Sequence, residues 1–407
     1  MLQHINQFLN RVSVLIKTSP FLRHNTIFMV GSLGVSVLNY LFYPILGRLM
    51  SPADFGEVQA LTSLFTQAAI FLTILTYVTI HVTVNTPDEQ ERNQTLLGLE
   101  RVAMIVGYSL LTIALLLVDQ LRVFLHFSES WPFVALIVAL ALSIPLAFRM
   151  AFLRGKKQFL RASFTDGIGS ATKLILAPIF VILGYHSFGA IGALAIAQIV
   201  SLVVSLNWAR KAGFHGFAFG KSARLRSDLL KPYLRHAGSV LLGVGGVTFI
   251  QTLDVLAIKH YFSPTEAGLY AGIATIAGII YFLMAPVTAV LITLVSSSQT
   301  IRKNQARLKA SLALMLLLGG GALITMSLFP EIIINILVGS KYLASADYLP
   351  RVGLAMLFLG VANMLMMYHI ALKRYKYSLV SIATCAVMLS LMLVNHGKIE
   401  DVVNNIV

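Results

Sequence analysis

Long apolar runs separated by short polar turns repeat along nearly the whole chain. About 20 mostly apolar residues form a helix long enough to cross the ~30 Å hydrocarbon layer of a membrane. Eleven runs reach that length, at approximately residues 26–49, 57–84, 101–121, 132–153, 163–184, 189–209, 237–261, 267–295, 308–329, 349–372 and 377–395. No turn between them is large enough for a folded domain. The pattern predicts an all-α polytopic membrane protein.

A basic, glycine-containing linker divides these runs into six and five. We predict an N-terminal amphipathic surface helix at residues 1–25, a six-span bundle at 26–209, a basic cytoplasmic linker at 210–236, a five-span bundle at 237–395 and a short polar tail at 396–407. We therefore expect the second bundle to lack a twelfth span. Either the chain is truncated relative to a twelve-span ancestor, or the tail is a remnant of that span.

Residues 21–60 and 233–272 are two copies of one stretch, at a constant offset of 212 without a gap. Ten of the forty aligned positions are identical. The matches include the turn after each apolar run, which reads Ser-Pro-Ala-Asp-Phe-Gly in the first copy and Ser-Pro-Thr-Glu-Ala-Gly in the second. Such a repeat predicts two related helical bundles around a central cavity, with the substrate path between them.

Charged residues inside the predicted spans are the first candidates for a site. A charge at the centre of a spanning helix costs about 2.5–3.5 kcal/mol on insertion scales, so it usually faces a cavity or a partner. Lys173 and Asp254 are such residues, and Asp254 stands where the first copy has Phe42. Asp166 precedes Lys173 by two helical turns on one stripe, which predicts an ion pair between them.

Several further polar residues are candidates to line a cavity. They are Arg48, Arg149, Asn39, Gln67 and Gln251. The alternatives are snorkelling to the interface for the two arginines, which lie near span ends, and hydrogen bonding between packed helices for uncharged polar stripes.

Composition and charge agree with a membrane protein and add an orientation. Apolar residues make up 57% of the chain, charged residues 12%, and the net charge is +15. On the predicted topology, 24 of the 31 basic residues fall on one side. By the positive-inside rule that side, with the N-terminus, is cytoplasmic, and the C-terminus lies outside. These basic residues occupy short turns, which favours contact with lipid headgroups over binding of nucleic acid.

Motifs for catalysis or cofactors are absent from the sequence. The single cysteine, Cys385, lies in an apolar span, and no histidine has partners at metal-ligand spacing. There is also no phosphate-binding GxxxxGK[ST] loop and no serine nucleophile elbow. We therefore expect no enzyme activity, no metal and no cofactor.

Weak signatures spread over most of the chain resemble one transporter family. They are GRLMSPADFG at 47–56, LRGKKQF at 153–159, LDVL at 253–256 and SPTEAGLY at 263–270. They are similar to the polysaccharide flippases, the O-antigen-type translocases of lipid-linked oligosaccharide in the multidrug/oligosaccharidyl-lipid/polysaccharide superfamily. The resemblance implies alternating access in the cytoplasmic (inner) membrane and a polyprenyl-diphosphate-linked glycan as substrate. The polysaccharide assembly machinery is then a further candidate partner besides the lipid bilayer.

This resemblance suggests roles for the candidate residues. Lys173, with Arg48 and Arg149, would bind the diphosphate, since an anion in the membrane requires compensating cations. Asn39, Gln67 and Gln251 would contact sugars, and Asp254 would bind a coupling ion, H⁺ or Na⁺. The alternatives are a multidrug cation antiporter of the same superfamily, a membrane polysaccharide polymerase or glycosyltransferase, and a non-transporting scaffold.

Overall fold

A computed structural model describes residues 20–214, 227–295, 300–372 and 374–406, and they are almost entirely helical. The first half, named by its place in the chain, comprises α2 (Pro20–Leu49), α3 (Pro52–Asn85), α4 (Glu89–Leu116), α5 (Val118–Phe124), α6 (Trp131–Gly155), α7 (Phe159–Ile182) and α8 (His186–Lys211). The second half comprises α9 (Ser227–Tyr261), α10 (Pro264–Leu294), α11 (Ile301–Leu328), α12 (Pro330–Leu337), the 3₁₀ segment η1 (Ser340–Tyr348), α13 (Leu349–Ala371), η2 (Tyr375–Tyr377), α14 (Ser378–Val394) and α15 (Ile399–Ile406).

Ten of the eleven predicted spans each fall on one helix, and the span at 101–121 covers the end of α4 and the start of α5. Within the described ranges, nine helices are long and apolar enough to cross a membrane, and α14 is a shorter apolar helix. The predicted span at 26–49 falls on α2. The prediction of an all-α membrane protein is confirmed. Most of the predicted N-terminal surface helix and part of the predicted linker lie outside the described residues, so both stay predictions.

The duplicated Ser-Pro turns set the start of two central helices. Ser51 accepts a hydrogen bond from the backbone N–H of Asp54, and Ser263 forms a complete capping box with Glu266. A proline follows each serine at the first helical position, where its missing N–H costs nothing. The two copies therefore fold alike, each into a helix, a tight turn and a second helix.

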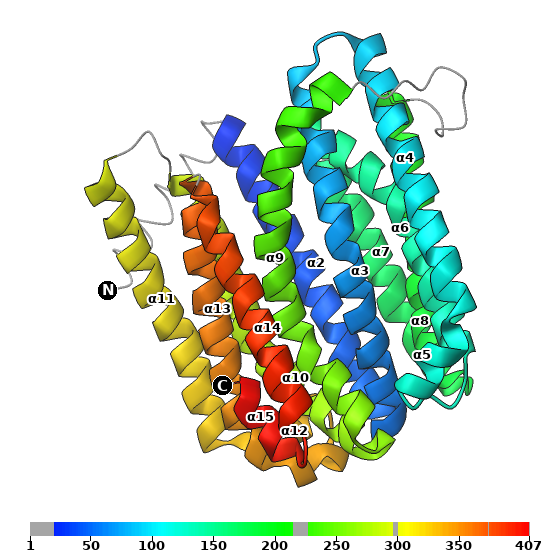
Figure 1. Cartoon of the computed structure of the whole chain (residues 1–407), viewed down its shortest axis with the longest axis vertical. Helices are drawn as coiled ribbons and strands as arrows, with labels where there is room; N and C mark the ends of the chain where they lie inside the picture. The colour runs from blue at the N-terminus through cyan, green and yellow to red at the C-terminus, as the bar shows by residue number, and fades with distance from the viewer. Residues whose placement is uncertain (1–19, 215–226, 296–299, 373, 407) are drawn as a thin grey trace.

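The two halves also pack alike (Figure 1). In the first half α2 packs on α7 and α3 packs on α6, while in the second half α9 packs on α14 and α10 packs on α13. The halves meet where α3 lies against both α9 and α10. In the first half α8 packs against both α6 and α7, and no described helix takes the corresponding place beside α13 and α14.

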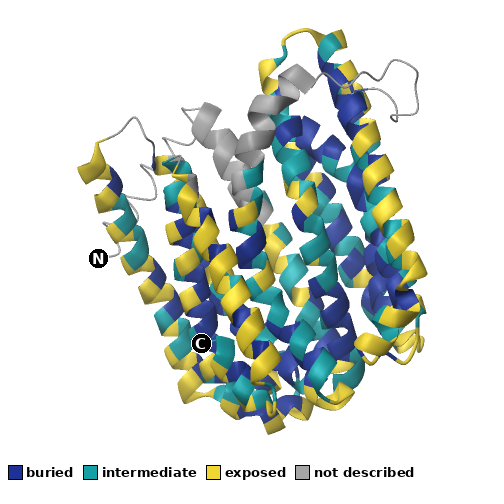
Figure 2. Ribbon diagram, viewed as in Figure 1, coloured by how far each residue is buried: buried dark blue, intermediate teal, exposed yellow. Residues whose placement is uncertain are grey.

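The turns between the helices lie at two opposite ends of the molecule, and the two ends differ in their share of acidic and basic residues. One end, named the acidic end, carries the two Ser-Pro turns together with α5, α12 and α15 (Figure 1, bottom). The opposite, basic end carries the turns after α3, α6, α10 and α13. Many positions of α4, α11 and α14 are exposed (Figure 2), and large apolar residues occupy much of that surface. Such a surface suits contact with lipid rather than water.

The residues predicted as a polar tail form a packed helix instead. α15 lies against α9, α13 and α14, and its Val402 and Val403 are fully buried. Arg351 of α13 also donates a hydrogen bond to Glu400 of α15, with 2.6 Å between the nitrogen and the oxygen. Residues 399–406 are too few to cross a membrane, but their apolar face is sufficient to dock them on the second half.

Candidate functional site

A polar pocket of about 260 Å³ lies inside the first half, between α2, α6, α7 and α8. We name it the Lys173 pocket. Its polar lining residues are Asn39, Asp166, Ser170, Lys173, Gln198 and Ser201. They come from three helices, because the polar stripes of α2 and α7 face one another and face α8. The spacing of polar residues predicted these stripes, although not which helices they would meet.

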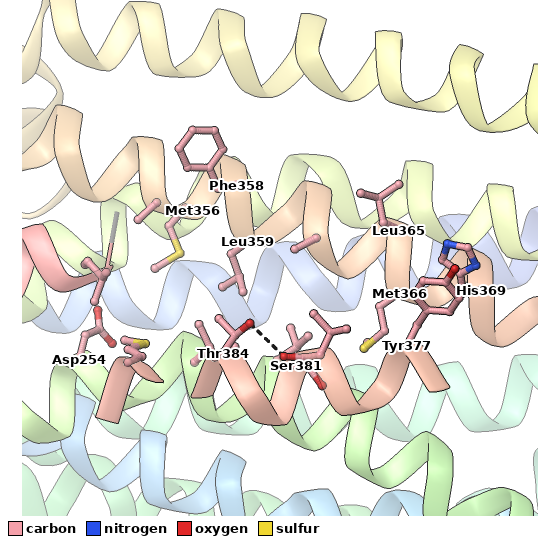
Figure 3. Close-up of a pocket in the computed structure, with 17 residues that line it drawn as sticks. Asp254, Met356, Phe358, Leu359, Leu365, Met366, His369, Tyr377, Ser381 and Thr384 are labelled. Carbon is pink, nitrogen blue, oxygen red and sulfur yellow. Dashed lines mark hydrogen bonds between the residues drawn. The ribbon is translucent and has the colours of Figure 1, made fainter. Parts of the chain in front are cut away.

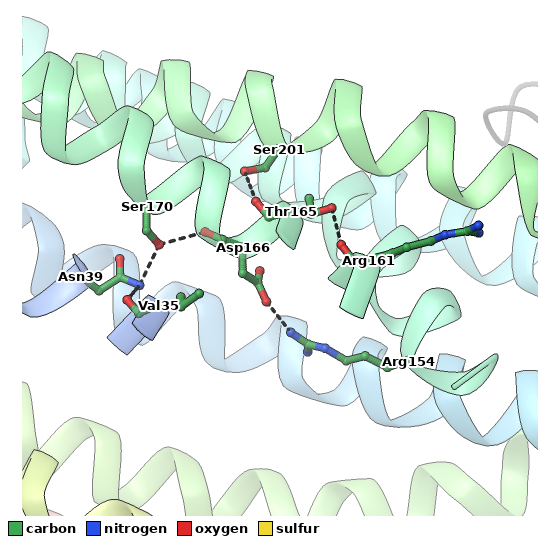
Figure 4. Close-up of polar contacts among 8 residues, drawn as sticks. All are labelled: Val35, Asn39, Arg154, Arg161, Thr165, Asp166, Ser170 and Ser201. Atoms are coloured by element: carbon green, nitrogen blue, oxygen red, sulfur yellow. Dashed lines mark hydrogen bonds and ion pairs between the residues drawn. The ribbon is translucent and has the colours of Figure 1, made fainter. Parts of the chain in front are cut away.

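Two charged residues line this pocket, Asp166 and Lys173. Of the two, Lys173 has no ion-pair partner among the described residues. Its side chain is buried, with 9% of its surface exposed. The ammonium donates to Oδ1 of Asn39 at 2.9 Å and lies 4.4 Å from the centre of the Phe42 ring. Asn39 in turn donates to the hydroxyl of Ser170 at 3.0 Å (Figure 4). The lysine is thus held by an amide and an aromatic face, which leaves its positive charge unneutralised.

The predicted ion pair between Asp166 and Lys173 is wrong. Asp166 instead accepts a hydrogen bond from the guanidinium of Arg154 at 3.0 Å (Figure 4). The reason is geometric, since seven residues along a helix separate two side chains by about 10.5 Å of axial rise. Arg154, at the end of α6, lies close enough to pair with the carboxylate of Asp166.

Neither of the two arginines predicted to bind substrate lines the Lys173 pocket or the larger pocket of the second half. Arg149 is fully buried and forms an ion pair with Glu100 of α4, and it also donates to the carbonyl of Pro145 at 3.0 Å. Arg48 lies at the acidic end, where its guanidinium donates to backbone carbonyls at the end of α12. Of the three predicted cations, Lys173 is the one that lines either of these two pockets.

The two glutamines predicted as sugar ligands lie on helices where the halves meet. Gln67 of α3 donates to the hydroxyl of Thr252 of α9 at 2.9 Å. Gln251 is half-buried on α9, next to that contact. Neither residue lines the Lys173 pocket. Gln67 belongs instead to the contact between the halves.

A larger and mostly apolar pocket of about 460 Å³ lies in the second half, and Asp254 lines it (Figure 3). We name it the Asp254 pocket. It is formed by α9, α13, α14 and α15, with Asp254 near one end and His369 and Tyr377 near the other (Figure 3). The carboxylate of Asp254 is 1% exposed and accepts a hydrogen bond from Tyr270. Its other oxygen, Oδ1, has no hydrogen-bond partner among the residues that the structure describes.

The sequence analysis did not identify three buried residues that form polar contacts: Tyr270, Glu57 and Glu100. Tyr270 is the partner of Asp254, yet its sequence position marks it only as one aromatic residue in an apolar span. Glu100 and Glu57 are both buried, although the span pattern placed them at the edges of helices. Glu57 accepts a hydrogen bond from Ser187, and a signal for its position inside a helix was the start of α3 five residues earlier, after Ser51.

Comparisons with known proteins give a family and a fold. The family model for polysaccharide biosynthesis proteins matches residues 21–299. No curated protein sequence matches the chain. Among solved structures, an inward-facing multidrug resistance MATE family transporter of the MOP superfamily is similar with a TM-score of 0.71, at 13% identity over 91% of this chain and 90% of that one.

Two further solved structures extend this comparison. The lipid II flippase MurJ in an inward closed conformation is similar with a TM-score of 0.72, at 13% identity over 94% of this chain and 84% of that one. An outward-facing MATE family transporter gives a TM-score of 0.56, at 15% identity over 95% of this chain and 90% of that one. At these identities the likeness is one of fold, and the fold is that of MOP-superfamily transporters.

Proposed function

Because the chain belongs to the family of polysaccharide biosynthesis proteins, we propose that it moves a polyprenyl-diphosphate-linked oligosaccharide from one leaflet of the membrane to the other. The observation that carries this proposal is the unpaired positive charge of Lys173 in the Lys173 pocket. A buried lysine there has an amide as its partner and no carboxylate. A cation in that position is ready to bind an anion.

The chemistry of the substrate requires such a site. A diphosphate carries negative charge that hydrocarbon cannot solvate, and the cost of burying it is met only by cations and hydrogen-bond donors. Lys173 supplies the cation. Asn39, Ser170, Gln198 and Ser201 line the same pocket and supply hydrogen-bonding groups that suit phosphate oxygens or the first sugar. The lipid tail would stay in the bilayer.

Asp254 is the group best placed to bind a coupling ion. Among the described residues of the second half, it is the one buried carboxylate, and one of its oxygens lacks a hydrogen-bond partner there. Burial without a cation favours uptake of a proton or of Na⁺. We propose that the affinity of Asp254 for this ion changes as the halves rock between the two access states.

We infer the orientation of the chain in the membrane from the distribution of charge. We place the basic end in the cytoplasm and the acidic end outside, in the cytoplasmic membrane. The N-terminus would then be cytoplasmic and the end of α14 outside. The higher TM-scores with two inward conformations, 0.71 and 0.72 against 0.56 with an outward one, support the assignment of this structure to an inward-facing state. The substrate would enter from the cytoplasmic leaflet.

The decisive experiment measures the accumulation of lipid-linked glycan in a strain that lacks the gene. Cells that carry the wild-type chain should clear the glycan from the inner leaflet. Lys173→Met and Asp254→Asn should each fail to do so at equal expression, whereas Lys303→Met, an exposed lysine at the basic end, should restore clearance. Wild-type clearance by both pocket variants would overturn the assignment of these residues. Loss of resistance to cationic drugs, with no accumulation of glycan, would favour a multidrug antiporter instead.

A further inference from the structure

At the acidic end, the end of a helix in each half is held by a cation from the other half. Arg48, near the end of α2, donates to the carbonyls of Asn335 at 3.1 Å and Leu337 at 3.3 Å, and also to that of Ile336 between them. These carbonyls belong to the last turn of α12. Carbonyls in the last turn of a helix lack intrahelical partners and carry partial negative charge, so a guanidinium binds them well.

The contact is reciprocal. Lys341, just after α12, donates to the carbonyls of Arg48 at 3.0 Å and Met50 at 2.9 Å, which end α2. The hydroxyl of Tyr342 also donates to the carbonyl of Gly47 at 3.3 Å. Each of the two helix ends therefore supplies the carbonyls that the other half's cation binds. The two halves cannot separate here without exposing both sets.

The repeat produces a second contact of the same kind on the other side of the interface. The residue 212 positions after Arg48 is His260, near the end of α9. Its Nδ1 donates to the carbonyl of Phe124 at 2.7 Å, and its ring stacks on the Phe124 ring with 3.9 Å between the ring centres. Phe124 is the last residue of α5, a short helix of the first half. The neighbouring ammonium of Lys259 lies 4.9 Å from the centre of the Phe127 ring.

Between the two contacts, repeat-related residues touch one another. Gly56 of α3 and Gly268 of α10 are 212 positions apart, and a Cβ on Gly56 would lie 2.9 Å from the Cα of Gly268. A Cβ on Gly268 would overlap the carbonyl of Pro52. Gln59 likewise donates to the carbonyl of its repeat mate Ala271 at 3.5 Å. The axis that relates the halves therefore passes through this glycine contact.

We propose that these contacts form a gate that closes the acidic end and that must break when the protein opens to the outside. The gate consists of Arg48 with Lys341 on one side, His260 with Phe124 on the other, and the Gly56–Gly268 contact on the axis. All of them join one half to the other. When the two halves tilt away from each other at this end, both outer contacts break in the same step, so the gate opens as a unit. This inference rests on the proposed transport cycle.

Spin-label distances across the acidic end test the gate. Labels are placed at Glu129→Cys in the first half and Glu331→Cys in the second, both exposed, with Cys385→Ser in the background. In liposomes, the parent should give mainly one short distance. The double variant Arg48→Ala/Lys341→Ala should move a several-fold larger population to a longer distance. Lys398→Ala removes an exposed lysine at the same end that holds no helix end of the other half, and should leave the distribution unchanged.

A substitution without charge provides an independent arm. Gly268→Ala should shift the same distance distribution toward the long component, because the methyl group cannot fit against Pro52. Gly278→Ala is the matched control, since that position in the same helix has only the edge of Phe282 at 4.0 Å. A sedimentation or gel-filtration profile like that of the parent verifies folding. Unchanged distances in folded Arg48→Ala/Lys341→Ala and in folded Gly268→Ala would overturn the gate.

The distance measurement needs no substrate, so it separates the gate from the proposed function. If the distances shift as expected while glycan clearance is normal in Lys173→Met, the gate stands and the substrate assignment fails. If the distances do not shift while Lys173→Met abolishes clearance, the gate fails and the substrate assignment stands.

Discussion

At the scale of single residues, the buried ion pair of Arg149 and Glu100 tests how much a buried charge depends on its partner for stability. Both side chains are at most 1% exposed. Removing one partner leaves a buried charge uncompensated, which typically costs about 3–5 kcal/mol. We expect Glu100→Gln to lower the thermal unfolding midpoint in detergent markedly, and Glu100→Leu/Arg149→Met to recover much of the loss. Arg351→Met, which breaks an exposed pair, should change the midpoint little. Equal shifts for Glu100→Gln and Arg351→Met would contradict this reading.

Single residues also show where sequence reasoning stops. The cost of a central charge predicted that Lys173 and Asp254 face a cavity or a partner, and each of them lines a pocket in the structure. It could not supply their partners, because Asn39 lies 134 positions from Lys173 in the chain and only the packing of α2 on α7 joins them. Arg48 illustrates the same limit, since a guanidinium near a span end suits a cavity, the interface or a helix end equally well. The carbonyls that bind it belong to α12, almost 290 positions later.

At the scale of elements, long helices are predictable and short ones are not. Every predicted span is helical, with a break at Leu117 in the span 101–121, because a run of about 20 apolar residues has few alternatives in a membrane. The short helices α5, α12 and α15 have 7 or 8 residues each, below the length at which apolar runs are informative. Their positions follow from tertiary contacts, such as the burial of Val402 and Val403.

The docking of α15 should depend on pH through Glu400. Its hydrogen bond and charge attraction to Arg351 lower the pKa of this carboxyl from the ordinary value of 4.5. A lowered pKa stabilises the docked state above the unfolded value, and this contribution is lost as pH falls through the lowered pKa. We expect amide exchange of residues 399–406, corrected for intrinsic rates, to stay constant from neutral pH to about 4.5 and to accelerate below it.

A variant isolates this interaction from other effects of acid. Arg351→Gln should give faster exchange of α15 already at neutral pH and should remove most of its acid dependence. Lys303→Gln, at the basic end, should behave as the parent does. If Arg351→Gln retained the acid dependence in full, another group would control the docking of α15.

At the scale of the whole molecule, one offset of 212 relates the turns, the central helices and the contacts between the halves. The sequence repeat predicted two related bundles, and the structure adds that the repeat axis runs through Gly56 and Gly268. Two copies of one unit related by such an axis contact each other through equivalent residues of the turn that both copies contain. The short helices α5 and α12 then lie where each can accept a hydrogen bond from a side chain of the opposite copy.

The transport cycle proposed here requires the halves to move against each other, and a cross-link between them should stop it. Gln67 and Thr252 join α3 to α9 by a hydrogen bond of 2.9 Å. In a Cys385→Ser background, we expect a short bifunctional thiol reagent on Gln67→Cys/Thr252→Cys to block glycan clearance, and a cleavable version to restore it after reduction. The same reagent on Arg351→Cys/Glu400→Cys joins two residues of the second half and should leave clearance intact. Undiminished clearance with complete cross-linking of the first pair would mean that α3 and α9 move as one body, and that any rocking takes place elsewhere.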